Sequence, residues 1–217
     1  MNLAEALRLI VITDHGLAKT RSVDEVVLDV LRAGVKAIQL RDKEASARDL
    51  LDQALRLRER TREFGALLFI NDRLDVALAA GTDGVHLGPD DLPVGAARSA
   101  SPPDFLIGTS TDVPDVALDL QFAGADYIGC GAVFPTTSKK DAGEVIGVEG
   151  LAAVASAVDI PVVGIGGVTP EGARLIAEGS GAVGTAAISA VMAAPDPGKA
   201  ALELLGSFKS KPAQGDG

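Results

Sequence analysis

The chain has 217 residues, of which 47% are hydrophobic, and a formal net charge of −10 at pH 7. This is enough apolar material for one large folded domain, and we expect a single domain over residues 1–208 with a polar, disordered tail over 209–217. The negative charge disfavours binding to nucleic acid or to an anionic membrane, and an aromatic content of 3% leaves few side chains for base stacking.

The sequence also predicts a cytoplasmic location. Its single cysteine, Cys130, cannot form an internal disulfide, and the N-terminus lacks the basic and apolar segments of an export signal. No apolar stretch reaches the roughly 18 residues that a membrane span needs. Cys130 lies in an apolar run without a basic neighbour, which favours a packing role over a nucleophilic one.

Eight short runs of β-forming residues recur along the chain, separated by stretches with helical periodicity such as 23–33 and 47–64. We expect strands at residues 9–13, 37–40, 67–70, 84–87, 105–108, 127–131, 161–165 and 182–186, the last interrupted by Gly184. Strict alternation predicts a parallel sheet in an α/β protein. Eight units in about 200 residues favour a single closed (β/α)8 TIM barrel over an open doubly wound sheet.

Capping residues mark the predicted helix boundaries. Ser22, Ser46 and Thr169 predict helix starts, and Pro170 suits a first helical turn. Glycine, which closes helices in the left-handed conformation, follows the predicted helices at Gly34, Gly65, Gly81, Gly124 and Gly179.

In such a barrel, chemistry takes place at the carboxyl ends of the strands. At the end of the second strand, Gln39, Arg41 and Lys43 occupy alternate positions, so we expect their side chains to point the same way, about 6.7 Å apart. A solvated edge strand gives the same pattern. Two cations and an amide at this spacing also suit a diphosphate.

Two carboxylates follow the next two predicted strands. Asp72 is either a helix cap paired with Arg73 or, together with Asp91, a ligand of one ion, because neighbouring strands lie about 4.8 Å apart. Two carboxylates with waters and substrate oxygens are a typical arrangement for Mg²⁺. We expect His86 to be a hydrogen-bonded core imidazole, and the sequence assigns no role to His15.

Hydroxyl and ammonium groups follow the fifth and sixth strands. Ser110 lies at the predicted mouth of the barrel, where helix capping explains it as well as ligand binding does. After the sixth strand, the hydroxyls and cations can donate to anionic oxygens; they are Thr136, Thr137, Ser138, Lys139 and Lys140. Gly167, Ile188 and Ser189 follow the last two strands, where this fold commonly binds phosphate.

Taken together, these motifs resemble the thiamine phosphate synthase family over about residues 9–192, in matching order and spacing. The residues that carry the resemblance are Gln39, Arg41 and Lys43; Asn71-Asp72-Arg73; Gly88-Pro89-Asp90-Asp91-Leu92-Pro93; Gly108-Thr109-Ser110; Pro135-Thr136-Thr137-Ser138-Lys139-Lys140; and Gly164-Ile165-Gly166-Gly167. As a set they are highly specific, although each alone is weak.

The resemblance implies a transferase of thiamine biosynthesis with Mg²⁺ as its cofactor. It couples hydroxymethylpyrimidine diphosphate to a thiazole phosphate, or its carboxylated form, by a dissociative substitution that releases pyrophosphate. By motif position, the implied diphosphate-binding residues are Gln39, Arg41, Lys43, Asn71, Ser110 and Lys139, with Arg41, Lys43, Ser110 and Lys139 catalytic. The implied thiazole phosphate ligands are Thr136, Thr137, Ser138, Gly167, Ile188 and Ser189, and the implied metal ligands are Asp72 and Asp91.

Three departures from the family pattern stand out. Ser138 replaces the more usual threonine, Pro89 replaces a frequent glutamine, and the stretch 179–187 is one residue longer. Two alternatives remain: a paralogous thiazole tautomerase, which lacks the full diphosphate and magnesium set, and a phosphate-binding barrel without turnover. The expected partners are small-molecule substrates, and a homo-oligomer is compatible with the sequence.

Overall fold

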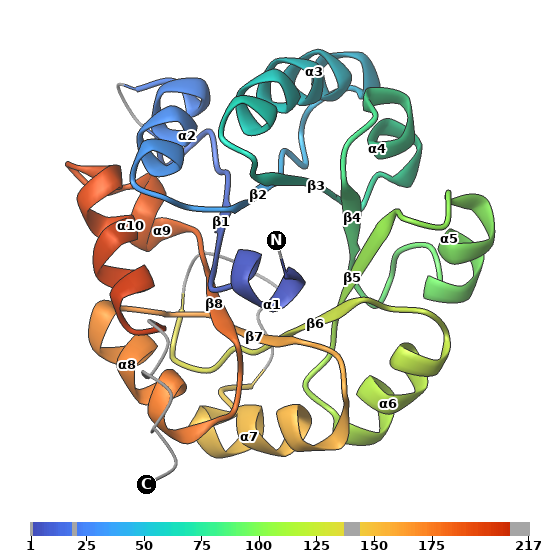
Figure 1. Ribbon diagram of the computed structural model, residues 1–217, viewed down its shortest axis with the longest axis vertical. Coiled ribbons are helices and arrows are strands. Elements are labelled where there is room, and N and C mark those ends of the chain that lie inside the picture. Colours follow the sequence, from blue (N-terminus) through green and yellow to red (C-terminus); the bar gives the residue numbers. More distant parts are fainter. Residues whose placement is uncertain (1, 19–20, 137–143, 209–217) are drawn as a thin grey trace, which may run out of the picture.

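The computed structural model describes residues 2–18, 21–136 and 144–208, and there the strands close into a barrel surrounded by helices (Figure 1). Each strand pairs in parallel with the next, and the last pairs with the first. The strands are β1 (Leu9–Ile12), β2 (Ala37–Leu40), β3 (Leu67–Asn71), β4 (Gly84–Leu87), β5 (Leu106–Ser110), β6 (Tyr127–Cys130), β7 (Val162–Ile165) and β8 (Gly184–Ala187). The predicted (β/α)8 barrel is confirmed.

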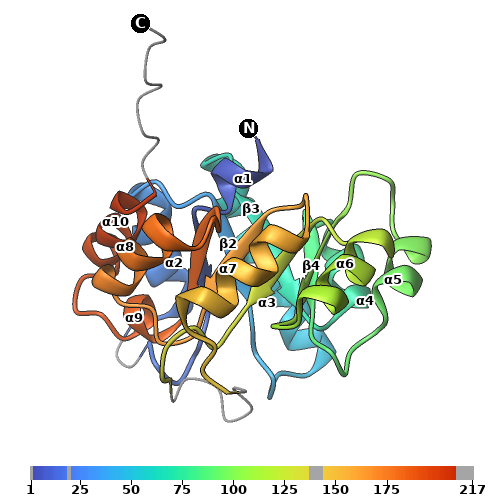
Figure 2. The ribbon, with the colours of Figure 1, turned by 90° about the horizontal axis from the view of Figure 1, so that it is seen from below.

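The helices form the outer layer, and a short N-terminal helix lies across one end of the barrel (Figures 1 and 2). They are α1 (Leu3–Ala6), α2 (Val23–Arg32), α3 (Ala47–Glu63), α4 (Leu74–Ala80), α5 (Val94–Ala100), α6 (Pro114–Phe122), α7 (Gly147–Ala157), α8 (Pro170–Gly179), α9 (Ser189–Met192) and α10 (Pro197–Gly206). Among the helices of the described residues, none combines the length and apolar character that crossing a membrane requires.

Strand boundaries agree with the sequence within two residues, and two-residue shifts occur at the end of β5 and at the start of β8. Strand β8 begins at Gly184 instead of being interrupted there. A Cβ atom on Gly184 would lie 2.1 Å from the carbonyl oxygen of Leu7, in the segment that joins α1 to β1. Glycine therefore marks the point where the first and last strands meet as the barrel closes.

The predicted helix caps are confirmed. The Ser22 side chain accepts a hydrogen bond from the Glu25 N–H in a capping box, Ser46 and Thr169 cap α3 and α8, and Pro170 occupies the first turn. Glycines with positive φ follow α2, α3, α4 and α6. Gly179 ends α8 as expected, but the left-handed residue is Gly181, with φ of 72°.

Two aromatic side chains lie in the interior of the barrel. Tyr127 and Phe69 are fully buried and contact each other edge to face, with ring centroids 5.3 Å apart. Gly108 leaves the room for this arrangement, since a Cβ atom there would lie 2.1 Å from the Tyr127 ring. Cys130 is buried as well, and burial raises the pKa of its thiol to about 12, in line with a packing role.

Candidate active site

A cavity of about 400 Å³ opens at the carboxyl ends of the strands. Most of the predicted site residues line it: Arg41, Lys43, Asn71, Asp72, Asp91, Ser110, Thr136, Gly167, Ile188 and Ser189. Pro89, one of the departures from the family pattern, also lines it. Thr137, Ser138 and Lys139 lie outside the described residues. The structure thus brings side chains from distant parts of the sequence to one rim.

Arg41 and Lys43 reach this rim from the segment that follows β2. The backbone of Arg41 is fixed by the buried Thr13, whose hydroxyl accepts a hydrogen bond from the Arg41 N–H at 2.9 Å and donates one to the Arg41 carbonyl at 3.3 Å. Thr13 comes directly after β1, the strand that neighbours β2. This pairing sets where the first cation emerges from the barrel wall.

Gln39 differs from the expectation that it would share one surface with Arg41 and Lys43. It lies within β2, is only 2% exposed, and its side chain lies next to Tyr127 inside the barrel. It lines a small second cavity of about 10 Å³ and not the large one. The alternation of a strand does not extend to Arg41 and Lys43, because β2 ends at Leu40.

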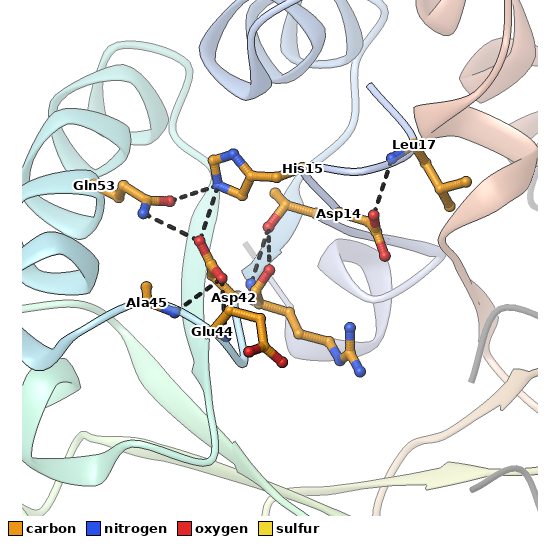
Figure 3. A network of polar contacts seen from close by, with 9 residues as sticks. Asp14, His15, Leu17, Asp42, Glu44, Ala45 and Gln53 are labelled. Atoms are coloured by element: carbon orange, nitrogen blue, oxygen red, sulfur yellow. Dashed lines mark hydrogen bonds and ion pairs between the residues drawn. The ribbon is translucent and has the colours of Figure 1, made fainter. Parts of the chain in front are cut away.

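A polar cluster holds the segment that carries Lys43 (Figure 3). One carboxylate oxygen of Asp42 accepts hydrogen bonds from two backbone N–H groups of its own loop, at 3.2 and 3.1 Å. The other oxygen lies 3.4 Å from both the Gln53 amide nitrogen and His15 Nε2, and His15 Nε2 is 2.8 Å from the Gln53 oxygen. His15 therefore joins the loop after β1 to the loop after β2 and to α3.

Asp72 and Asp91 face each other at the rim. Their carboxyl groups are close enough to share a proton when Asp72 is protonated, and Asp91 accepts a hydrogen bond from the Gly88 N–H at 2.7 Å. The alternative role of Asp72 as a helix cap is wrong, because α4 has no side-chain cap and Arg73 pairs with Asp75 at 2.6 Å. Asp72 adopts a positive φ of 64°.

The charge balance around Asp72 bears on metal binding. Burial and the neighbouring Asp91 raise the pKa of Asp72 to about 6, although Lys43 and Arg41 act to lower it. A divalent cation between the two carboxylates would relieve their repulsion, and oxygen donors suit a hard ion such as Mg²⁺. Within the described residues, no group of three or more His, Cys, Asp or Glu side chains is placed to hold a metal. The protein would thus contribute the two carboxylates.

Ser110 is connected to the barrel interior through His86. His86 Nε2 is 2.8 Å from Ser110 Oγ, and His86 Nδ1 is 3.0 Å from the Tyr127 hydroxyl. The expected hydrogen-bonded core imidazole is confirmed, but His86 also lines the cavity. One residue in the sequence signals this arrangement, namely Gly129 in the middle of β6, where a Cβ atom would lie 3.1 Å from the His86 ring.

The opposite part of the rim is built from glycine-rich backbone. Gly166 and Gly167 have φ values of 97° and 61°, and Gly166 accepts a hydrogen bond from the Phe134 N–H at 3.1 Å. A Cβ atom on Gly167 would lie 2.4 Å from the Pro135 carbonyl oxygen, so the loops after β6 and β7 are in direct contact. With Thr136, Ile188 and Ser189, they line the cavity after β6, β7 and β8, which lie two to four strands around the barrel from β2 and Arg41.

Known proteins share this sequence and fold. The family model for thiamine monophosphate synthase matches residues 9–191. The thiamine-phosphate synthase of Pyrococcus furiosus is 46% identical over 204 residues, which cover 94% of this chain and 96% of that protein. A bifunctional ThiM/ThiE protein of thiamine biosynthesis from Symbiobacterium thermophilum is 50% identical over 182 residues, 83% of this chain but only 38% of that longer protein. The solved structure of a Pyrococcus furiosus thiamine phosphate pyrophosphorylase has a TM-score of 0.88 at 44% identity, covering 95% of this chain and 98% of that one.

Proposed function

Because the chain belongs to the thiamine monophosphate synthase family, we propose that it is a transferase that couples hydroxymethylpyrimidine diphosphate to a thiazole phosphate and releases pyrophosphate. The resemblance drawn from the motifs agrees with this membership. The observation that carries the proposal is one cavity lined by two cations, Arg41 and Lys43, beside two facing carboxylates, Asp72 and Asp91. That combination suits a diphosphate bound together with a metal ion.

On the diphosphate side, Arg41 and Lys43 hold the phosphate oxygens, while Asn71 and Ser110 donate hydrogen bonds from neighbouring strands. Breaking the bond between carbon and oxygen concentrates negative charge on the leaving pyrophosphate, which the cations stabilise more in the transition state than in the ground state. Lys139 is proposed for the same role from its motif position, and Gln39 for contact with the pyrimidine from inside the barrel.

Asp72 and Asp91 would hold Mg²⁺. Their proximity and the raised pKa of Asp72 support this, since a partly buried pair of carboxylates is unfavourable without a proton or a cation between them. When bound, the ion supplies positive charge that neutralises diphosphate oxygens. The Gly88 N–H, at 2.7 Å from Asp91, keeps one of the two carboxylates oriented.

On the other side of the cavity, Thr136, Gly167, Ile188 and Ser189 hold the thiazole phosphate, together with Thr137 and Ser138 from the motif. This division places the two substrates on facing parts of one rim, so that the thiazole nitrogen meets the pyrimidine methylene as pyrophosphate leaves. The electron-rich pyrimidine carries the positive charge in between. A protein nucleophile is not needed, and the buried Cys130 thiol, with its raised pKa, is unsuited to that role.

The test is an assay of the purified protein with both substrates and Mg²⁺. We expect thiamine phosphate and pyrophosphate in equal amounts, and loss of product when a chelator removes the metal. Interconversion of thiazole isomers without coupling would instead identify a tautomerase. Tight binding of the diphosphate with no product would identify a binding protein.

The same assay tests the metal ligands. We expect Asp91→Ala to lower kcat/KM by at least about 100-fold, because charge stabilisation is removed from the transition state. Asp104→Ala is the matched control, since Asp104 is exposed and precedes β5 at the opposite end of the barrel. Equal activity of the two variants would exclude the proposed role of Asp91.

We further propose that residues 1–208 act as one catalytic domain in the cytoplasm. The continuous barrel through α10 and the single buried Cys130 support this proposal. Light scattering of the purified protein determines whether it forms a homo-oligomer.

A further inference from the structure

Three polar side chains, those of Tyr127, His86 and Ser110, form a hydrogen-bonded chain inside the barrel, and Gln39 lies next to Tyr127. Gln39 from β2 contacts Tyr127 from β6, Tyr127 contacts His86 from β4 at 3.0 Å, and His86 contacts Ser110 from β5 at 2.8 Å. Gln39, Tyr127 and His86 are buried, and Ser110 ends the chain at the large cavity. A polar chain connects the barrel core to the rim.

The hydrogen bonds between these side chains have a donor-to-acceptor direction that follows from the chemistry of the groups. Burial raises the pKa of the Tyr127 phenol, so the phenol keeps its hydroxyl hydrogen. The hydroxyl hydrogen of Tyr127 is then free to be donated to His86 Nδ1. A neutral imidazole that accepts at Nδ1 carries its proton on Nε2 and donates it to Ser110 Oγ.

We propose that Tyr127 and His86 are positioning residues that fix the Ser110 hydroxyl as a hydrogen-bond donor toward the large cavity. Ser110 Oγ accepts from His86, so its own hydrogen points to the ligand. This inference rests on the proposed function only for the identity of that ligand, the diphosphate. Ser110 touches the substrate, whereas Tyr127 and His86 act through it.

Packing alone does not explain why these hydrogen-bonded polar side chains lie inside the barrel. Burying polar side chains in an apolar barrel is unfavourable unless each is hydrogen-bonded, and apolar side chains of similar volume would fill the same space. The backbone is shaped around these groups as well. Gly108 and Gly129 leave room for Tyr127 and His86, whose nearest atoms would lie 2.1 and 3.1 Å from a Cβ atom at those positions.

The tautomer of His86 is directly measurable because the protein sequence contains only two histidines. In protein labelled with ¹⁵N-histidine, we expect His86 to show a protonated Nε2 and an unprotonated Nδ1, with His15→Gln providing the assignment. Tyr127→Phe should convert this single tautomer into a mixture, because Nδ1 loses its donor. A proton on Nδ1 in the unmodified protein would overturn the proposal.

A double-mutant cycle then tests whether Tyr127 acts through Ser110. We expect Tyr127→Phe to lower kcat by about 5- to 10-fold, with KM for the pyrimidine diphosphate within about twofold. In a Ser110→Ala background, the same substitution should lower kcat by less than about twofold. Full additivity of the two substitutions would overturn the proposal.

Two comparisons separate positioning from folding. Phe69→Leu removes the ring that packs against Tyr127, so it should lower Tm and combine additively with Ser110→Ala. His86→Gln retains a donor toward Ser110 and should keep at least about fivefold more activity than His86→Asn, whose shorter side chain does not reach Ser110. Equal activities of these two variants would count against the proposed positioning of Ser110 by His86. If the protein had no coupling activity but His86 showed the expected tautomer in its spectrum, the proposed function would be contradicted and the proposed positioning of Ser110 would still hold.

Discussion

Asp72 is the residue at which backbone strain and charge coincide. Within the described part of the chain, it is the non-glycine residue with positive φ, at 64°, a conformation that costs roughly 1–2 kcal/mol for most residues. Its N–H donates to the His86 carbonyl at 2.8 Å, which fixes this conformation. The Asp72 carboxylate lies beside Asp91, and backbone strain of this kind is concentrated at functional sites.

Removal of the Asp72 charge should stabilise the metal-free protein. The folded-state pKa of about 6 is above the ordinary value of 3.8, so the stabilisation that this group provides is full below pH 3.8 and is lost as the pH rises through 6. We therefore expect Asp72→Asn to raise Tm at pH 7.5 by a few degrees and to change it little at pH 4. Thermal unfolding in the presence of a chelator measures both values.

Asp75→Asn is the matched control for Asp72, with the opposite sign. Hydrogen bonds from Arg73 lower the pKa of Asp75, so its stabilising contribution is present above pH 3.8 and is lost on acidification. We expect a small decrease in Tm at pH 7.5, because the pair is exposed. An equal response of the two variants at pH 7.5 would show that burial and Asp91 do not determine the charge of Asp72.

Lys43 tests the cationic part of the rim. We expect Lys43→Ala to lower kcat/KM by at least about 100-fold, since the leaving pyrophosphate loses one of its positive partners. Steady-state kinetics with both substrates measures this change. Lys199→Ala on α10 is the control and should leave kcat/KM within about twofold, because Lys199 does not line the cavity. Comparable losses in both variants would indicate a general charge effect.

The rim residues could be predicted from the sequence because polar side chains directly after apolar strands lie where the barrel core ends and its mouth begins. The depth of Gln39 and the contact between Asp72 and Asp91 could not be predicted in this way. Gln39 lies inside as part of β2, whereas Arg41 and Lys43 follow the end of that strand at Leu40, and Asp72 has a positive φ. Both depend on the local backbone, which residue types alone do not determine. The role of His86 depends on partners from two other strands.

At the scale of elements, β1 positions the segment after β2. Thr13→Val removes both hydrogen bonds from the Thr13 hydroxyl to the Arg41 backbone but preserves the shape of the side chain. We expect a loss of about 1–2 kcal/mol in the free energy of unfolding. KM for the pyrimidine diphosphate should rise by about fivefold, because Arg41 is no longer fixed. Urea denaturation and steady-state kinetics measure the two effects.

Thr185→Val is a close control for Thr13. Thr185 is also fully buried, in β8, and in the described part of the chain its hydroxyl has no hydrogen-bond partner. Replacing that hydroxyl with a methyl group should be neutral or stabilising, because an unsatisfied buried polar group is removed. If Thr13→Val were equally harmless, the two hydrogen bonds to Arg41 would not matter for the site.

Helix and strand boundaries were predictable where a single residue determines them. Ser22, Ser46 and Thr169 cap helices through their own side chains, so neighbouring sequence is sufficient. The start of β8 differs from the predicted start, and the strand begins at Gly184, which lies against the backbone of Leu7, a residue far away along the chain. A boundary that depends on how the barrel closes cannot be read from local sequence.

At the scale of the whole molecule, the two ends of the barrel serve different roles: one end holds the cavity and the other contributes to stability. Arg58 of α3 pairs with Asp83 just before β4, and Asp83 accepts a hydrogen bond from the Leu68 N–H in β3 at 2.8 Å. Two strands further on, Arg98 of α5 pairs in the same way with Asp126 before β6. These repeated ion pairs connect helices to the amino ends of the strands, opposite the cavity, where residues commonly serve stability.

Breaking one of these ion pairs should reduce stability without affecting catalysis. The Arg58 and Asp83 side chains are only 15% and 22% exposed, so Asp83→Asn leaves a largely buried guanidinium without its charge partner. We expect the free energy of unfolding to fall by about 2–3 kcal/mol. This corresponds to a decrease in Tm of roughly 4–12 °C for a chain of this size. In contrast, kcat and KM at 25 °C should stay within about twofold.

Glu178→Gln provides the comparison for Asp83→Asn, because Glu178 pairs with Arg174 on the exposed surface of α8, where an ion pair contributes about 0–1 kcal/mol. Calorimetry and steady-state kinetics on both variants decide the point. A loss of activity in Asp83→Asn at temperatures well below its Tm would show that the two ends of the barrel are coupled. The separation of stability at one end from chemistry at the other would then fail for this protein.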